Sequence, residues 1–119
     1  MGEAPWQKDW ISTIAEGQFM LGYGFANGRG VTADLPAAIR WYKSAADRGH
    51  VIAQNNLGLA YRDGRGVDRD PAEAYKWLSL AADRKYTLAV NNLESLLPGL
   101  TAADVAEGKR RAGTWKPAQ

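Results

Sequence analysis

The sequence predicts an all-α fold, a solenoid of helix-turn-helix repeats about two and a half units long with a capping helix at each end. The main observation is a 36-residue repeat, since residues 15–50 align on residues 51–86 without a gap and are identical at 14 positions. A third copy begins at residue 87, where AQNNL of residues 53–57 returns as AVNNL of residues 89–93. Within each unit, apolar residues recur at helical spacing and a glycine-rich joint separates two helices.

The first helix of each unit is predicted from one apolar face. Ala53, Leu57 and Tyr61 follow the i, i+4, i+8 spacing that places side chains on the same side of a helix. Gly22 and Gly58 fall inside this helix, where glycine costs about 1 kcal/mol relative to alanine. We expect close packing on the second helix to offset that cost, with the Ala-Ala pairs at 45–46 and 81–82 as the small partners.

The joint between the helices reads NGRGVTAD at residues 27–34 and DGRGVDRD at residues 63–70. Gly28 and Gly64 stand where a helix ends, and glycine adopts the positive φ of such a position without strain. Asp70 is then expected to cap the next helix, with proline at its first position and Glu73 as a capping-box acid. A phosphate-binding loop would follow a strand and open its helix at the glycines. The stretch is therefore predicted to be a joint.

The second helix and the chain ends complete the predicted domain. Ala74, Trp77, Leu78 and Ala81 form the apolar stripe of the second helix. We expect one domain with repeats at 15–50 and 51–86, a partial repeat at 87–97, and a capping helix with its tail at 98–119, opened by TAAD at 101–104. Residues 1–14 are either an N-terminal cap or an eroded repeat, with Trp6, Trp10 and Ile14 on one side of a helix. Trp115 is expected to fold back onto the bundle.

Composition excludes several classes of function. The chain has no cysteine, which rules out disulfides and thiolate metal sites, and no cofactor is implied. A net charge of +2 is too small for a dedicated nucleic-acid surface, and no run of about 18 apolar residues predicts a membrane span. The absence of cysteine fits the cytoplasm and equally a periplasmic domain whose signal has been removed, so both compartments stay open.

The repeat resembles the Sel-one-like repeat (SLR) family, a relative of the tetratricopeptide repeat. The L-G, G-x-G-V, D, A-x-x-W and A-A positions of residues 15–49 and 53–83 all fall in the family register. The resemblance implies a right-handed superhelix whose first helices line a concave face. It also implies a non-enzymatic adaptor that binds another protein or a peptide, often in bacterial envelope and signalling systems. Small-ligand binding is less expected.

Candidate partner-binding residues are those expected to point away from the second helix, along the concave face. Aromatic rings supply apolar burial there, amides pair with a peptide backbone, and a guanidinium pairs with a carboxylate. The nine candidates are Glu16, Phe19, Tyr23, Ile52, Asn55, Leu59, Arg62, Asn91 and Ser95. Two alternatives stay open: Ile52, Leu59 and Leu88 pack against neighbouring helices, or the N-terminal segment covers Phe19 and Tyr23. Asn56 and Asn92 are interpreted as structural hydrogen-bonding residues.

Rival functions have weaker support in the sequence. His50, the one histidine, is interpreted as a solvated turn residue, and no metal or catalytic residue accompanies it. The basic run at 109–111 shares its predicted helix with Asp104 and Glu107, so nucleic-acid binding is not expected. The remaining alternative is a domain of a larger bacterial envelope or signalling protein whose open repeat ends stack on themselves as a weak homo-oligomer.

Overall fold

The computed structural model describes the backbone of residues 5–118 and the side chains of residues 10–118. Helices make up most of the described chain, and the predicted all-α solenoid of helix pairs is confirmed. In chain order the elements are α1 (Pro5–Asn27), α2 (Leu35–Asp47), α3 (Val51–Asp63), α4 (Pro71–Asp83), α5 (Thr87–Leu96), the 3₁₀ helix η1 (Leu97–Gly99) and α6 (Ala102–Thr114). Among the described residues, no helix is both long and apolar enough to span a membrane.

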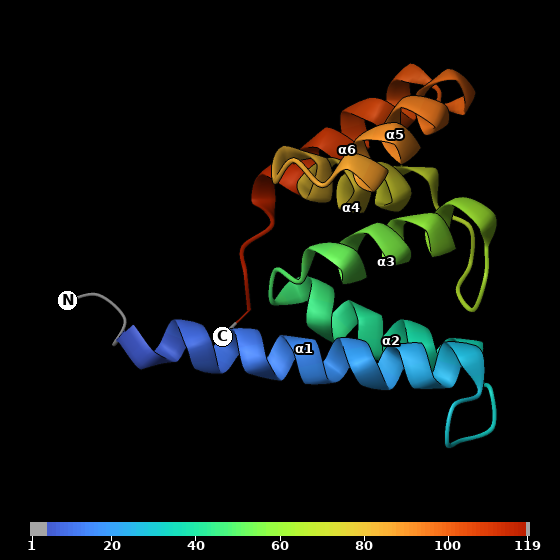
Figure 1. The fold of residues 1–119 in the computed structure, drawn as a ribbon. Helices are drawn as coiled ribbons and strands as arrows, with labels where there is room; N and C mark the ends of the chain where they lie inside the picture. The colour runs from blue at the N-terminus through green and yellow to red at the C-terminus, as the bar shows by residue number, and fades with distance from the viewer. Residues whose placement is uncertain (1–4, 119) are drawn as a thin grey trace.

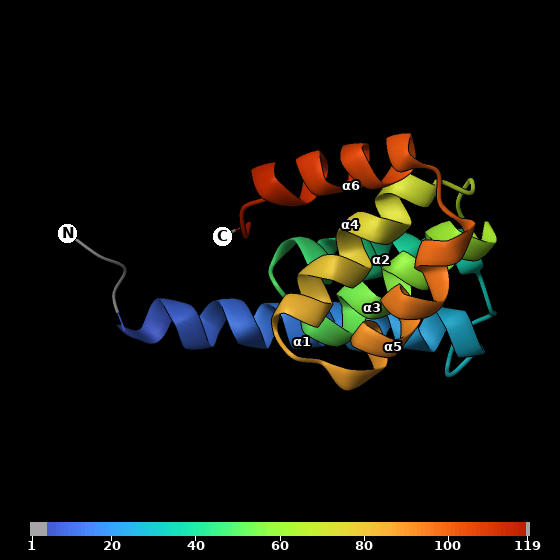
Figure 2. The same cartoon turned by 90° about the horizontal axis from the view of Figure 1, so that it is seen from above.

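Consecutive helices pack as antiparallel pairs that stack into one body (Figure 1). The pair α1 and α2 joins the pair α3 and α4 through contacts between α2 and α3, while α4 also packs on α5 and α6. Viewed from above, α1, α3 and α5 lie toward one side of the molecule and α2, α4 and α6 toward the other (Figure 2). The first helices of the repeats therefore share one face.

The glycine-rich joints have the predicted conformation. Gly28 and Gly64 end their helices with φ of +66° and +69°, in the left-handed region that favours glycine. The Asp34 side chain caps α2 by accepting the amide of Ala37 at 3.0 Å. Asp70 caps α4 in the same way, accepting the amide of Glu73 at 3.2 Å. The joint turns the chain back on itself and exposes its arginine side chains.

The expected capping box at α4 is not closed. The Asp70 amide donates to the Tyr61 carbonyl at 3.0 Å. The Glu73 carboxylate instead accepts the indole N–H of Trp77 at 3.0 Å and a guanidinium N–H of Arg111 at 3.1 Å. A residue one turn further along α4 and a tertiary partner on α6 therefore replace the expected bond. The box predicted at the start of the last helix does close, between Thr101 and Asp104.

Glycine allows the two helices of each pair to approach closely, but the neighbours differ from those predicted. A Cβ built at Gly22 would lie 2.6 Å from the Tyr42 ring, and one at Gly58 would lie 2.7 Å from Cγ of Leu78. The Ala-Ala pair at 45–46 instead packs in a core cluster with Ala53, Leu57 and Trp77, which belong to the following repeat. Small residues at the end of α2 thus make room for the next unit.

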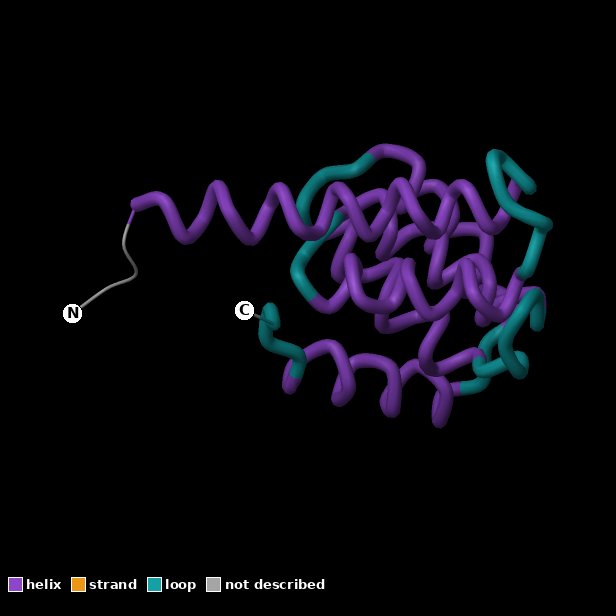
Figure 3. Tube along the Cα trace, turned by 90° about the horizontal axis from the view of Figure 1, so that it is seen from below, coloured by secondary structure: helices purple, strands orange, loops and turns teal. Residues whose placement is uncertain are grey.

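The two ends of the solenoid differ. Residues 5–14 continue the same helix as the first repeat, and α1 projects beyond the packed body (Figure 3). Trp10 is 61% exposed, while the side chain of Trp6 lies outside the described residues. At the other end, α6 packs on α4, and Trp115 folds back against Trp77 as expected.

Candidate functional site

The exposed face of the first helices includes most of the predicted partner-binding residues. Glu16 and Ile52 occupy equivalent positions of α1 and α3, and both side chains are exposed. Tyr23, Leu59 and Ser95 occupy a second equivalent set, in which Leu59 is half-buried and the other two are exposed. The repeat thus brings side chains far apart in the sequence onto one surface.

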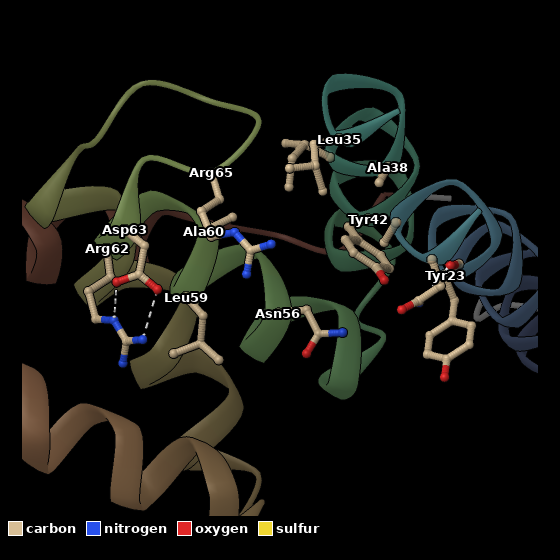
Figure 4. A pocket seen from close by; sticks show the side chains of 13 residues that line it. Tyr23, Leu35, Ala38, Tyr42, Asn56, Leu59, Ala60, Arg62, Asp63 and Arg65 are labelled. Atoms are coloured by element: carbon tan, nitrogen blue, oxygen red, sulfur yellow. Dashed lines mark hydrogen bonds and ion pairs between the residues drawn. The ribbon is translucent and has the colours of Figure 1, made fainter. Parts of the chain in front are cut away.

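A cavity of about 430 Å³ opens on this face between α1, α2 and α3 (Figure 4). Three of the predicted residues line it, namely Tyr23, Leu59 and Arg62. Its apolar lining comes mainly from α2 and α3, and its polar lining comes from all three helices and the following joint. The other lining residues are Ala26, Asn27, Leu35, Ala38, Ile39, Tyr42, Asn56, Ala60, Asp63 and Arg65.

Next to the cavity, Phe19 and Glu16 are held by His50. Phe19 stacks on the His50 ring with centroids 4.6 Å apart and on Tyr42 at 5.6 Å. His50 Nδ1 accepts the Ala53 amide at 3.1 Å, so the neutral ring carries its proton on Nε2, which lies 2.8 Å from a Glu16 carboxylate oxygen. The His50 side chain is 11% exposed. The interpretation of His50 as a solvated turn residue is therefore wrong, because it caps α3 and ties that helix to α1.

The Asn55 side chain does not lie on the open face, where the sequence analysis expected it. Its residue is 4% exposed, and its side-chain oxygen accepts a hydrogen bond from the Asn92 amide at 3.0 Å. This bond joins α3 to α5 and leaves the Asn55 side chain away from the open face. The structural interpretation of Asn92 is confirmed by the same bond. Asn91, the repeat equivalent of Asn55, is exposed on α5.

Tyr42 and Asn56 are cavity residues that the sequence analysis did not assign to the face. Burial raises the pKa of the Tyr42 hydroxyl, and a hydrogen bond with the Asn56 side chain opposes that rise. Because Tyr42 belongs to a second helix, a search confined to the first helices passes over it. One signal was available: Gly22 lies inside a helix, and its lack of a Cβ makes room for the Tyr42 ring.

The loop end of the face carries an excess of positive charge. Arg62 donates from Nε and a terminal nitrogen to the two carboxylate oxygens of Asp63, at 2.8 and 2.9 Å. This hydrogen bonding lowers the pKa of Asp63, and the charge of Arg65 acts in the same direction. The Arg29 guanidinium lies 5.3 Å from the centroid of the Tyr23 ring. Arg62 and Arg65 thus both act on the Asp63 carboxylate.

The basic run of α6 is largely occupied by local ion pairs. Arg111 reaches Asp70, the N-cap of α4, and Glu73 of that helix at 3.1 Å each, and Arg110 donates to Glu107 of its own helix. These pairs pin α6 to α4 and neutralise most of the run. The arrangement gives no row of free cations along α6 for a phosphate backbone.

Comparison with known proteins identifies the repeat. A family profile described as Sel1 repeat matches residues 15–50 and 51–86. The chain is similar to a solved structure of c5321, a protective antigen of uropathogenic Escherichia coli strains with an SLR fold, at 28% identity and a TM-score of 0.81. It is also similar to a Sel1 repeat protein from Oxalobacter formigenes, at 31% identity and a TM-score of 0.69.

These matches cover 91% and 86% of this chain, which spans 24% of the Escherichia coli chain and 44% of the Oxalobacter chain. The chain thus spans less than half the length of either solved relative. A search of curated proteins gives no match.

Proposed function

Because this chain belongs to the Sel1 repeat family, whose repeats generally form protein-interaction scaffolds, we propose that it is an adaptor that binds a peptide segment of another protein. The binding face is that of the first helices, α1, α3 and α5. The observation that carries the proposal is the cavity between α1, α2 and α3, which joins an apolar lining to a basic rim. The family is typically non-enzymatic, and an adaptor requires no chemistry at the site.

The cavity suits one apolar side chain of the partner. Leu35, Ile39 and Leu59 supply apolar lining, and a volume of about 430 Å³ accommodates a branched aliphatic or aromatic group. Burying such a group stabilises a complex by about 1.5–3 kcal/mol relative to leaving it exposed. Asn27 and Asn56 then pair with the polar backbone of the bound segment through their amides.

The rim suits a carboxylate on the same segment. Asp63 already neutralises Arg62, which leaves Arg65 as the surplus charge on the rim of the cavity. An arginine pairs with a carboxylate through two parallel N–H donors, which fixes orientation as well as adding affinity. We therefore expect the partner segment to carry an Asp or Glu close to its apolar anchor.

A displayed library of random peptides, selected on the intact chain, tests the proposal. We expect selected sequences to combine an apolar residue with a nearby acid, and their affinity to fall at least tenfold on Arg65→Glu and on Leu59→Ser. Lys43→Glu is the matched control, because Lys43 is exposed on α2 and does not line the cavity. Selected peptides that bind Arg65→Glu and Leu59→Ser as tightly as the wild type would contradict this site.

Self-association through α1 is the alternative function. Trp10, Met20 and Leu21 are 61%, 58% and 47% exposed, an unusual concentration of large apolar side chains on one helix. Sedimentation of the wild type and of Met20→Glu distinguishes self-association from the adaptor function. A dimer that forms with concentration and dissociates in the variant supports self-association, and a monomer in both supports the adaptor.

A further inference from the structure

The positions that line the cavity between α1, α2 and α3 form a second cavity in the first repeat. This second cavity has a volume of about 380 Å³ and is lined by Phe19, Met20, Tyr23, Gly24 and Arg29. We call it the Gly24 hollow. Its residues 20, 23, 24 and 29 lie 36 positions before four residues that line the first cavity, namely Asn56, Leu59, Ala60 and Arg65. The repeat therefore presents a similar cavity twice.

The two cavities adjoin at Tyr23, which lines both of them. Its side chain lies on the α1 side of the first cavity (Figure 4). Tyr23 is 38% exposed, so its ring is open to contact from a bound molecule. A segment that enters the first cavity can therefore continue past Tyr23 into the Gly24 hollow.

Gly24 leaves the space of the hollow open. A Cβ built at Gly24 would contact only the Arg29 carbonyl oxygen, at 3.5 Å. The Arg29 amide donates to the Gly24 carbonyl at 2.9 Å, which folds the joint back over the last turn of α1. A larger side chain at position 24 would therefore extend into the hollow without a clash at its Cβ.

The lining of the hollow suits an aromatic side chain. The Phe19 and Tyr23 rings lie with centroids 6.4 Å apart and planes tilted by 39°. Met20 adds a flexible thioether that is exposed, and methionine sulfur makes favourable contacts with aromatic rings. The equivalent residues of the second repeat are Asn55 and Asn56 in place of Phe19 and Met20. The hollow is thus the more apolar and aromatic of the two cavities.

The charge at the hollow suits an acid beside that aromatic group. The Arg29 guanidinium lies over the Tyr23 ring, and no carboxylate of the described residues pairs with it. Glu16, one turn before Met20 on α1, is already bonded to His50. Arg29 is exposed, so its N–H donors are available to a carboxylate of a partner.

We propose that the Gly24 hollow is a second subsite for the same partner segment, which takes an aromatic side chain next to an Asp or Glu. This inference rests on the proposed adaptor function and extends it. The partner segment carries two apolar residues, each with an acid nearby, so that each of the two cavities receives one such pair. Arg29 contacts the acid at the hollow as Arg65 does at the first cavity.

Nuclear magnetic resonance distinguishes the two subsites, because each is lined by a residue whose methyl group can be labelled. The Met20 methyl reports on the hollow and the Ile39 δ-methyl on the first cavity. The probe is the dipeptide N-acetyl-Phe-Asp-amide, and the uncharged N-acetyl-Phe-Asn-amide is its control. We expect a saturable shift of the Met20 signal with the first probe and at least fivefold weaker binding of the second.

Two variants test the residues that form the hollow. Gly24→Leu fills the hollow and should abolish the Met20 shift. Gly17→Leu is the matched control, because Gly17 is exposed on the same helix and lines neither cavity. If Gly24→Leu unfolds by circular dichroism, Arg29→Gln replaces it. That variant should weaken the Asp probe at least fivefold and leave the Asn probe unchanged, whereas Arg40→Gln on α2 should change neither.

Peptides selected on the intact chain test whether one segment uses both subsites. We expect those with two apolar and acidic pairs to lose at least tenfold in affinity on Gly24→Leu as well as on Leu59→Ser. Loss on Leu59→Ser alone, with only the Ile39 methyl shifted, would overturn the second subsite and leave the adaptor function standing. Loss on Gly24→Leu alone would support the hollow and contradict the first cavity. A shift of neither methyl, or a wild-type dimer that Gly24→Leu dissociates, would overturn the subsite.

Discussion

Gly22 and Gly58 occupy the same repeat position, and each is crossed by a large side chain of the paired helix. An added Cβ at Gly58 would lie 2.7 Å from the Leu78 side chain and 3.3 Å from the Ala74 carbonyl oxygen. The carbonyl belongs to the backbone and cannot move aside. Gly17, on the same kind of helix, has nothing within 4 Å of an added Cβ. Local propensity favours alanine at both sites, so packing alone separates them.

Substitution of these glycines by alanine should change stability in opposite directions. Gly17→Ala is expected to raise the free energy of unfolding by about 0.5–1 kcal/mol through helix propensity. Gly58→Ala gains the same propensity but incurs an overpacking cost of about 1–3 kcal/mol, so it should be destabilising overall. Urea denaturation of both variants measures the difference, and equal stabilisation would show that the helices separate at little cost.

Tyr42 should make folding stability depend on alkaline pH. Burial raises the pKa of its hydroxyl in the folded state, so the folded chain holds this proton more tightly than the unfolded chain. Its contribution is complete below the unfolded pKa of about 10 and is lost as the pH rises through the folded pKa. Denaturation at pH 9 and 11 should therefore show a smaller loss of stability in Tyr42→Phe than in the wild type, and an equal loss would mean that the hydroxyl ionises freely.

At the scale of helices, the aspartate that caps the second helix has an additional partner in the second repeat. Asp34 and Asp70 both cap the second helix of their unit. Asp70 also accepts a hydrogen bond from Arg111 of α6 at 3.1 Å, so the cap of α4 fixes the last helix as well. The same residue of the repeat thus makes an additional contact where a third helix lies nearby.

The two caps should differ in the cost of their removal. Loss of an aspartate cap costs about 1 kcal/mol, which we expect for Asp34→Ala. Asp70→Ala should cost more, because it also releases a half-exposed ion pair worth up to about 1 kcal/mol. In an Arg111→Ala background, the additional destabilisation caused by Asp70→Ala should disappear. A double-mutant cycle by chemical denaturation measures it, and an unchanged excess would place its origin outside the Asp70–Arg111 pair.

At the scale of the whole molecule, the position of a repeat in the stack decides how deeply its core is covered. Leu57 is fully buried because α2 of the preceding unit covers it together with its own α4. Leu21 is the identical residue of the first unit and is 47% exposed, since no described second helix precedes it. Stacking, and not the unit alone, completes the core of a repeat protein.

This difference in burial predicts that the same substitution lowers the free energy of unfolding by unequal amounts at the two positions. Leu57→Ala should lower the free energy of unfolding by about 2–5 kcal/mol, the range for a buried leucine. Leu21→Ala removes a side chain that is already half in water and should cost below about 1.5 kcal/mol. Thermal and urea unfolding of the pair measures both values. Equal costs at low protein concentration would indicate that Leu21 is covered in solution.

Much of the fold was predictable because its signals are local or repeat at a fixed spacing. The 36-residue register, the positive-φ glycines at 28 and 64 and the Asp caps each depend on a few neighbouring residues. The candidate face was predicted in part, since Tyr23, Leu59 and Arg62 line the cavity while Asn55 turns into the contact with α5. Tyr42 and Arg65 were missed because they reach the same cavity from the second helix and the joint.

By itself, the sequence determined the all-α class, the length of the repeat, the form of its joints and the family to which it belongs. Only the tertiary structure decided which equivalent positions of the repeat differ in their contacts. His50 bridges to Glu16, Glu73 pairs with Arg111, and Trp115 packs on Trp77. The physical reason is that a repeat specifies contacts inside a unit and with its neighbours. The ends of the stack and the meeting of distant side chains depend on how the whole chain closes on itself.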